Sequence, residues 1–118
     1  MKKIYYLSSC DTCKRIINDL ELPSDVVLQD IKTKSITSAQ IEEMRMLTNS
    51  YESLFSKRAR LYKERNLKEK SLSEYDYKNL ILEHYTFLKR PVLIYNNSIF
   101  IGNSKKTVEL AKETIHEQ

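Results

Sequence analysis

One feature constrains the fold of this chain most. A strand-like apolar pattern leads through a Cys-x-x-Cys pair directly into a helix pattern. The run from Lys3 to Leu7 is rich in apolar and aromatic residues, as is typical of a β-strand. The following residues recur at helical spacing and form one apolar face: Cys13, Ile16, Ile17 and Leu20. Cys10 is therefore expected at the N-terminus of the helix and Cys13 one turn inside it. Free N–H groups and the helix dipole stabilise a thiolate there, so the pattern predicts a nucleophilic Cys10.

A second strand pattern follows closely. Pro23 cannot continue the first helix, and residues Asp25–Ile31 again have the apolar character of a strand. Strand, helix and strand within about thirty residues form a βαβ unit, so the two strands should be parallel with a right-handed crossover.

The middle of the chain has helical patterns with two N-terminal capping motifs. Thr37 and Gln40 form a capping box, with Ile36 and Ile41 as its hydrophobic staple. Ser73 and Asp76 form a second box, which opens a longer helix. The expected inner face of that helix comprises Tyr77, Leu80, Ile81, His84 and Leu88.

The last third of the chain has a hairpin pattern. Two strand-like runs, Val92–Tyr95 and Ser98–Ile101, flank a two-asparagine turn. Gly102 is expected at a positive φ or a close backbone approach, and Ser104 is expected to cap a final helix.

The order of these elements predicts an α/β chain with a thioredoxin-like (glutaredoxin-like) fold. Its sheet should be mixed and four-stranded, with a helical insertion between strands 2 and 3. The prediction is a single domain, residues 1–118, with thioredoxin-like halves 1–32 and 90–118 and an insertion at 33–89.

Composition restricts the classes of function. No apolar run approaches the roughly 18 residues of a membrane span, and no signal-peptide core is present, so we expect a cytoplasmic protein without membrane contact. In that compartment a Cys-x-x-Cys pair favours redox chemistry over a structural disulfide. The two histidines, His84 and His116, stand apart from the cysteines, so no metal site is predicted.

A basic window stands out in the charge pattern. Residues Lys57–Lys70 hold seven basic and two acidic side chains, a local charge of +5 within a chain of net charge +4. A solvated helical face is the first interpretation, and an anionic partner or substrate is the alternative. No nucleic-acid motif accompanies the charge, so direct nucleic-acid binding is not predicted.

The sequence resembles the arsenate reductase (ArsC)/Spx family of thioredoxin-like proteins essentially end to end. The matching segments are Cys10-Asp11-Thr12-Cys13-Lys14, Ser56-Lys57-Arg58 after Leu54-Phe55, Arg90-Pro91-Val92 and Gly102.

The resemblance implies roles for individual residues. Cys10 matches the nucleophilic cysteine, and Arg90 matches the arginine that precedes a cis-proline, here Pro91, and holds an oxyanion. Electrostatics is consistent with these roles, because a guanidinium facing Cys10 would lower the pKa of the Cys10 thiol and bind an oxyanion. Arg58 and Lys14 are, with Pro91, the further candidate substrate-binding residues. For both basic side chains, an ordinary solvated charge is the alternative.

Two departures from the reductase pattern bear on function. Two further arginines of glutaredoxin-dependent arsenate reductases correspond here to Ser56 and Asn103, which weakens the case for arsenate as substrate. Cys13 instead matches the redox pair of the Spx regulators, where it would be a resolving thiol. A passive core residue is the alternative for Cys13, and a buried small side chain is the alternative for Cys10.

Two functions therefore stand. The first is a thiol oxidoreductase acting on a small oxyanion or a thiol/disulfide substrate, with no bound cofactor and with glutathione/glutaredoxin or thioredoxin as external reductant. The second is an Spx-like redox-sensing regulator that binds the C-terminal domain of the RNA polymerase α subunit. In both interpretations we expect a monomer.

Overall fold

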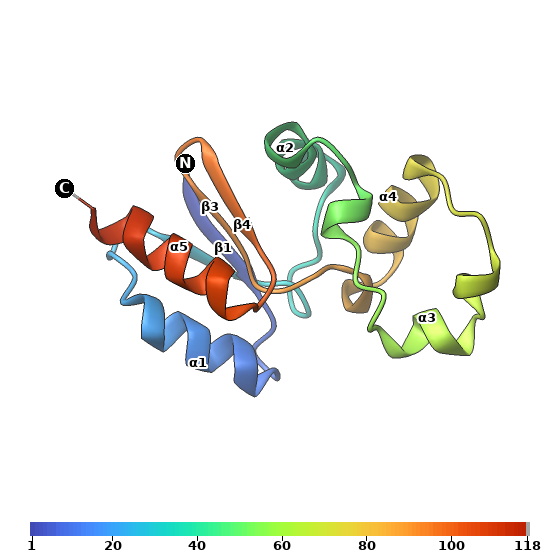
Figure 1. The fold of residues 1–118 in the computed structure, drawn as a ribbon, viewed down its shortest axis with the longest axis horizontal. Coiled ribbons are helices and arrows are strands. Elements are labelled where there is room, and N and C mark those ends of the chain that lie inside the picture. The colour runs from blue at the N-terminus through green and yellow to red at the C-terminus, as the bar shows by residue number, and fades with distance from the viewer. Residues whose placement is uncertain (118) are drawn as a thin grey trace. The chain divides into compact units, whose positions relative to one another are not determined.

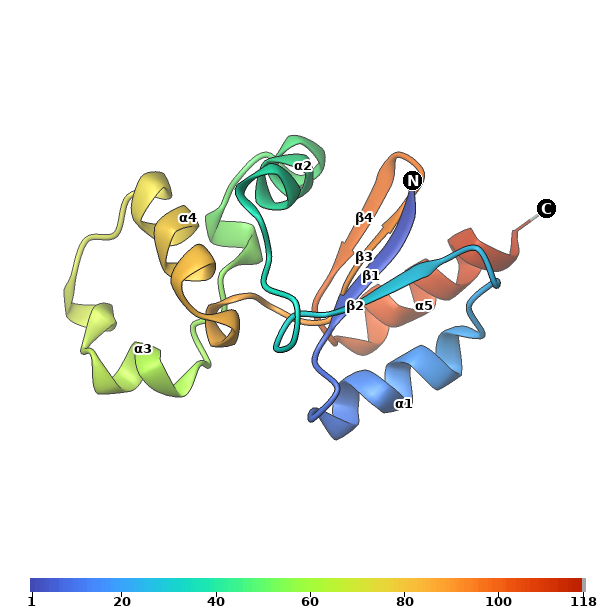
Figure 2. The ribbon, with the colours of Figure 1, turned by 180° about the vertical axis from the view of Figure 1, so that it is seen from behind.

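The computed structural model describes residues 1–117 and contains one mixed four-stranded sheet (Figure 1). Its strands are β1 (Lys2–Tyr6), β2 (Val27–Asp30), β3 (Val92–Tyr95) and β4 (Ser98–Ile101). The sheet order is β2-β1-β3-β4. Strand β1 pairs parallel to β2 and antiparallel to β3, which in turn pairs antiparallel to β4. Figure 2 shows β2 beside β1. The predicted mixed sheet, with its parallel first pair and its hairpin, is confirmed.

Five α-helices accompany the sheet in the described residues. They are α1 (Asp11–Leu20), α2 (Ser38–Thr48), α3 (Arg60–Glu64), α4 (Glu74–Glu83) and α5 (Lys105–His116). Short 3-10 turns lie between some of them: η1 (Glu52–Leu54), η2 (Leu67–Glu69) and η3 (Tyr85–Phe87).

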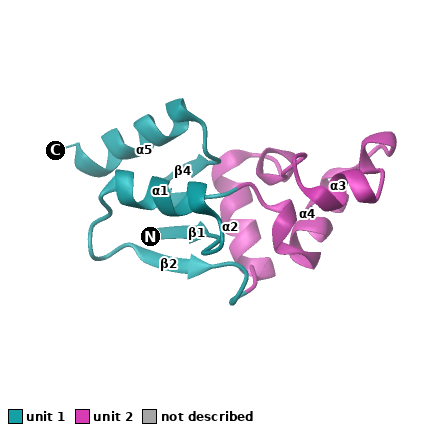
Figure 3. Cartoon of the chain, turned by 90° about the horizontal axis from the view of Figure 1, so that it is seen from below, with its two compact units in different colours: residues 1–34, 90–118 teal, residues 35–89 magenta. Residues whose placement is uncertain are grey.

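The chain divides into two compact units, coloured separately in Figure 3. The first contains residues 1–34 and the chain from Arg90 onward, and therefore holds the sheet with α1 and α5. The second contains residues 35–89 and is helical. The organisation as a single domain stays a prediction.

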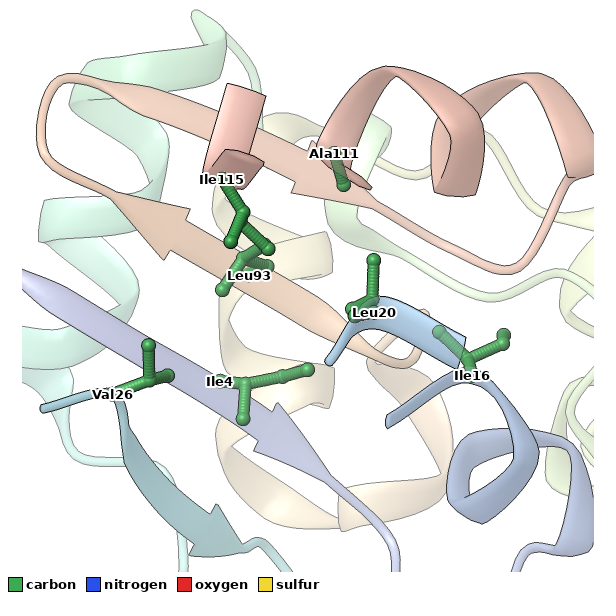
Figure 4. Packing of buried hydrophobic residues seen from close by; sticks show 7 residues of the cluster. All are labelled: Ile4, Ile16, Leu20, Val26, Leu93, Ala111 and Ile115. Atoms are coloured by element: carbon green, nitrogen blue, oxygen red, sulfur yellow. The ribbon is translucent and has the colours of Figure 1, made fainter. Parts of the chain in front are cut away.

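The core of the first unit lies between the sheet and two helices (Figure 4). Ile4 of β1 and Leu93 of β3 meet Leu20 of α1 and Ile115 of α5, and Ile16, Val26 and Ala111 complete the cluster. All seven are at most 7% exposed. Helices α1 and α5 thus cover the same face of the sheet, as Figure 1 also shows.

The two predicted capping boxes are both present in the second unit. The Thr37 side chain accepts from the N–H of Gln40, whose side chain accepts from the N–H of Thr37. The same reciprocal pair joins Ser73 and Asp76 at the start of α4. Each box satisfies N–H groups that a helix terminus would otherwise leave without partners.

The predicted length of α4 was wrong. The helix ends at Glu83, so His84 and Leu88 do not continue its inner face. His84 adopts an extended backbone, and its Nδ1 accepts from the N–H of Thr86 at 3.0 Å, which opens the turn η3. This local bond competes with helix continuation. Leu88 is nevertheless fully buried.

The hairpin and its flanks follow the sequence prediction. Asn96 in the turn has φ +56°, and Gly102 after β4 has φ +90°. The bond between Arg90 and Pro91 is cis, as the resemblance implied. Ser104 caps α5 by accepting from the N–H of Thr107.

Candidate functional site

The turn between β1 and α1 places Cys10 at the N-terminus of α1. The N–H of Cys10 donates to the carbonyl of Leu7 at 3.0 Å, and the carbonyl of Cys10 accepts from the N–H of Lys14 at 3.2 Å. Cys10 is the N-cap residue of α1 and has an extended backbone. The sulfur therefore lies beside the first-turn N–H groups, where a thiolate is stabilised.

Competing effects act on the half-buried Cys10 thiol. Burial alone raises its pKa, but hydrogen bonds from the N–H and the thiol of Cys13, the charge of Arg90 and the N–H of Thr12 lower it. The net result is a Cys10 pKa below the ordinary thiol value. These are the stabilising contributions expected at an activated cysteine.

The pKa of the Cys13 thiol shifts in the opposite direction, upward. Its side chain is fully buried on the inner face of α1, and burial is the largest cause that raises the pKa of its thiol, to about 11. The neighbouring Cys10 raises it further, whereas a backbone hydrogen bond from Leu7 and the charge of Arg90 lower it. At neutral pH Cys13 thus stays protonated and donates to the Cys10 sulfur. The structure holds both cysteines as free thiols.

The sheet register explains why Arg90 acts on these two thiols. Val92, the first residue of β3, pairs with Tyr5 near the end of β1 that leads to Cys10. The segment Arg90-Pro91 precedes Val92, so it lies at the same end of the sheet. Pro91 is buried, and its carbonyl accepts from the N–H of Gly102 at 2.9 Å.

The remaining sequence candidates have different surroundings. Lys14 is exposed, with its Nζ 3.8 Å from the carboxylate of Asp11 on the same helix. Arg58 and Ser56 belong to the second unit, and Asn103 is exposed in the first. The roles of Lys14 and Arg58 stay predictions.

Sequence reasoning missed one contact at this site. The hydroxyl of Ser8 donates to Oδ2 of Asp30 at 2.5 Å, and the N–H of Ser8 faces Oδ1 at 3.4 Å. Asp30 ends β2 and pairs in register with Tyr6 at the end of β1. The sequence shows an acidic residue at the end of the second of two parallel strands, but it does not show that Ser8 is its partner.

Neither a metal-binding cluster nor a membrane-spanning helix is present among residues 1–117. No group of three or more His, Cys, Asp or Glu side chains there could hold a metal ion. Among the same residues, no helix is sufficiently long and apolar to cross a membrane.

Comparison with known proteins places this chain in a family. The model of the ArsC family matches residues 5–111. The chain belongs to the ArsC family. A global transcriptional regulator Spx 2 from Bacillus cereus is 24% identical over 107 residues, covering 89% of this chain and 82% of that protein.

Solved structures agree on the fold of this ArsC-family chain. An arsenate reductase from Vibrio cholerae matches with a TM-score of 0.71 at 20% identity, covering 98% of this chain and 95% of that one. A Staphylococcus aureus COL protein matches with a TM-score of 0.75 at 24% identity, covering 93% and 97%. The predicted family and thioredoxin-like fold are confirmed.

Proposed function

We propose that this ArsC-family protein is a thiol oxidoreductase of the arsenate reductase type in which Cys10 is the nucleophile. The observation that supports the proposal is the division between the two thiols. Cys10, with its lowered pKa, lies at the start of α1, whereas the buried Cys13 has a pKa raised to about 11. A thiolate beside a protonated thiol is suited to attack followed by resolution.

The proposed reaction begins with attack of the Cys10 thiolate on a substrate disulfide. A bond forms between Cys10 and one substrate sulfur, the substrate S–S bond breaks, and the other sulfur leaves as a thiolate. Cys13 then loses its proton to solvent and attacks Cys10. This second exchange forms a Cys10–Cys13 disulfide and releases the first substrate sulfur. Two electrons have then passed from the cysteine pair to the substrate.

Turnover requires an external dithiol or two thiols, such as glutathione with glutaredoxin, or thioredoxin. These reduce the Cys10–Cys13 disulfide and become oxidised. For an oxyanion substrate such as arsenate, Arg90 is the proposed anion-binding group. The absence of arginine at Ser56 and Asn103 favours a thiol or disulfide substrate over arsenate.

Cysteine variants test the proposal. Reduction of arsenate and of a small disulfide is assayed with glutathione and glutaredoxin, and with thioredoxin, for wild type, Cys10→Ser and Cys13→Ser. We expect Cys10→Ser to be inactive and Cys13→Ser to accumulate a mixed disulfide visible by mass. Activity that does not depend on Cys10 would contradict the enzyme proposal.

A redox-sensing regulator is the second candidate, supported by the relative from Bacillus cereus, a global transcriptional regulator Spx 2. In this proposal, oxidation of Cys10 and Cys13 to a disulfide changes affinity for the C-terminal domain of the RNA polymerase α subunit. A pull-down with that domain, using the reduced and oxidised protein, tests the idea. No capture in either redox state would remove this candidate.

A further inference from the structure

The carboxylate of Asp30 fastens the turn that carries Cys10 to the neighbouring strand. Asp30 lies at the end of β2, and its carboxylate accepts from both the hydroxyl and the N–H of Ser8. The same carboxylate accepts from the N–H of Lys32 at 3.2 Å. Asp30 thus joins the segment after β1 to the segment after β2.

The contact lies two residues from the nucleophile, and the backbone transmits it. Leu7, next to Ser8, accepts from the N–H of Cys10 at 3.0 Å and forms a backbone hydrogen bond with the sulfur of Cys13. Cys10 is the N-cap of α1, so the turn that leads into the helix determines the position of its sulfur. A turn free to shift would move the sulfur from the N–H groups of Thr12 and Cys13.

We propose that Asp30 is a positioning residue for Cys10: its carboxylate holds Ser8 and so fixes the turn that presents the sulfur to the N-terminus of α1. The inference rests on the proposed function only in taking Cys10 as the reactive thiol. In this inference Ser8 and Asp30 act by positioning Cys10 and do not contact the substrate.

A competing explanation makes the opposite prediction. If Asp30 acted on Cys10 only through its negative charge, its removal would lower the Cys10 pKa, because a nearby like charge disfavours the thiolate. If Asp30 acts as a tether, removal raises the Cys10 pKa, because hydrogen bonds to the thiolate are lost. The sign of the shift therefore separates the two explanations.

The experiment measures the rate of alkylation of Cys10 by iodoacetamide against pH, with the modified peptide identified by mass. The variants are Ser8→Ala, Asp30→Ala and the double variant. We expect each to raise the Cys10 pKa, and a rise of about one unit would lower the rate of alkylation about tenfold at pH values well below the wild-type pKa. The double variant should be no worse than Asp30→Ala, because the two side chains form one contact.

Two matched controls are available in the first unit. Ser9→Ala removes the exposed neighbouring hydroxyl, and Asp25→Ala removes a carboxylate that pairs with Lys2 at 3.1 Å near the other end of β1. Both should leave the alkylation profile of Cys10 unchanged. Ser8→Thr keeps a hydroxyl and should restore most of the wild-type rate.

The proposal is overturned if Ser8→Ala leaves the Cys10 pKa unchanged, if Asp30→Ala lowers it, or if the two effects add. Should Asp30→Ala fail to fold, the exposed Ser8→Ala decides alone. A wild-type Cys10 with an ordinary pKa would contradict the proposed function instead. The two failures are thus distinguishable.

Discussion

At the scale of single residues, the two cysteines differ because α1 presents them differently. Cys10 precedes the helix, where its half-buried thiol lies beside N–H groups and responds to the charge of Arg90. Cys13 lies one turn later on the buried face. Two identical side chains three residues apart thus have opposite pKa shifts: the Cys10 thiol ionises more readily and the Cys13 thiol less readily.

Replacing Arg90 tests its part in this difference. Arg90→Met removes a charge that lowers the pKa of Cys10, so we expect that pKa to rise. Alkylation against pH measures the shift. Arg15→Met removes an exposed arginine of α1 and is the matched control. Equal profiles for both variants would show that Arg90 does not act on the thiolate.

The buried Cys13 gives stability a pH dependence. Its pKa is raised from 9.0 to about 11 on folding, so above pH 9 the unfolded chain loses the thiol proton before the folded chain does. This contribution is complete below pH 9 and is lost as pH rises through 11, on the order of 2 kcal/mol. Denaturant unfolding across pH gives the free energy of unfolding of wild type and of Cys13→Ala, and the difference between the two pH curves measures this contribution. Parallel curves from pH 8 to pH 11 would contradict the prediction.

At the scale of elements, capping residues determine where the helices of the second unit begin. Thr37→Ala removes the acceptor of the Gln40 N–H and should cost about 1 kcal/mol of stability. Thr37→Ser keeps the acceptor and should recover most of that loss. Chemical denaturation gives both values, and an unchanged midpoint for Thr37→Ala would show that the box adds nothing.

The same elements show what a sequence can predict. Both capping boxes, the parallel first strand pair and the hairpin have local patterns, and each was predicted correctly. The end of α4 was not, because the extended His84 backbone follows from a bond between its own ring and the N–H of Thr86. Such a bond has no periodic signature.

Prediction of the site was limited in the same way. The thiolate-stabilising position of Cys10 could be predicted, since it follows from a strand pattern meeting a helix pattern. The contact between Ser8 and Asp30 could not, because residues 22 positions apart meet only when the strand register is known. Register is set by three-dimensional pairing, to which a single sequence gives little access.

At the scale of the first unit as a whole, the core fixes α1 against the sheet. Leu93 is 2% exposed at the centre of the cluster that contains Leu20 and Ile115. Leu93→Ala should therefore cost about 2–5 kcal/mol, through lost burial and the cavity that remains. Leu110→Ala on α5, where the leucine is 46% exposed, is the control and should cost under about 0.5 kcal/mol. Similar losses for both, measured by denaturation, would contradict this view of the core.

The elements that form the core of the first unit also position the candidate site. Strands β1 and β3 and helix α1 each supply one part of the site: the turn to Cys10, the approach of Arg90, and the N–H groups beside the sulfur. Each of these elements also contributes to the buried cluster. The geometry around Cys10 thus depends on the fold of the first unit.

The ionisation of Cys10 in the wild-type protein is the most direct test of its proposed role as the reactive thiol. Alkylation of Cys10, followed by peptide mass across a pH series, gives its pKa separately from that of Cys13. We expect a midpoint below the ordinary thiol value of about 8.5, with Cys13 unreactive at the same pH. A Cys10 midpoint at or above that value, or equal reactivity of both thiols, would contradict that role.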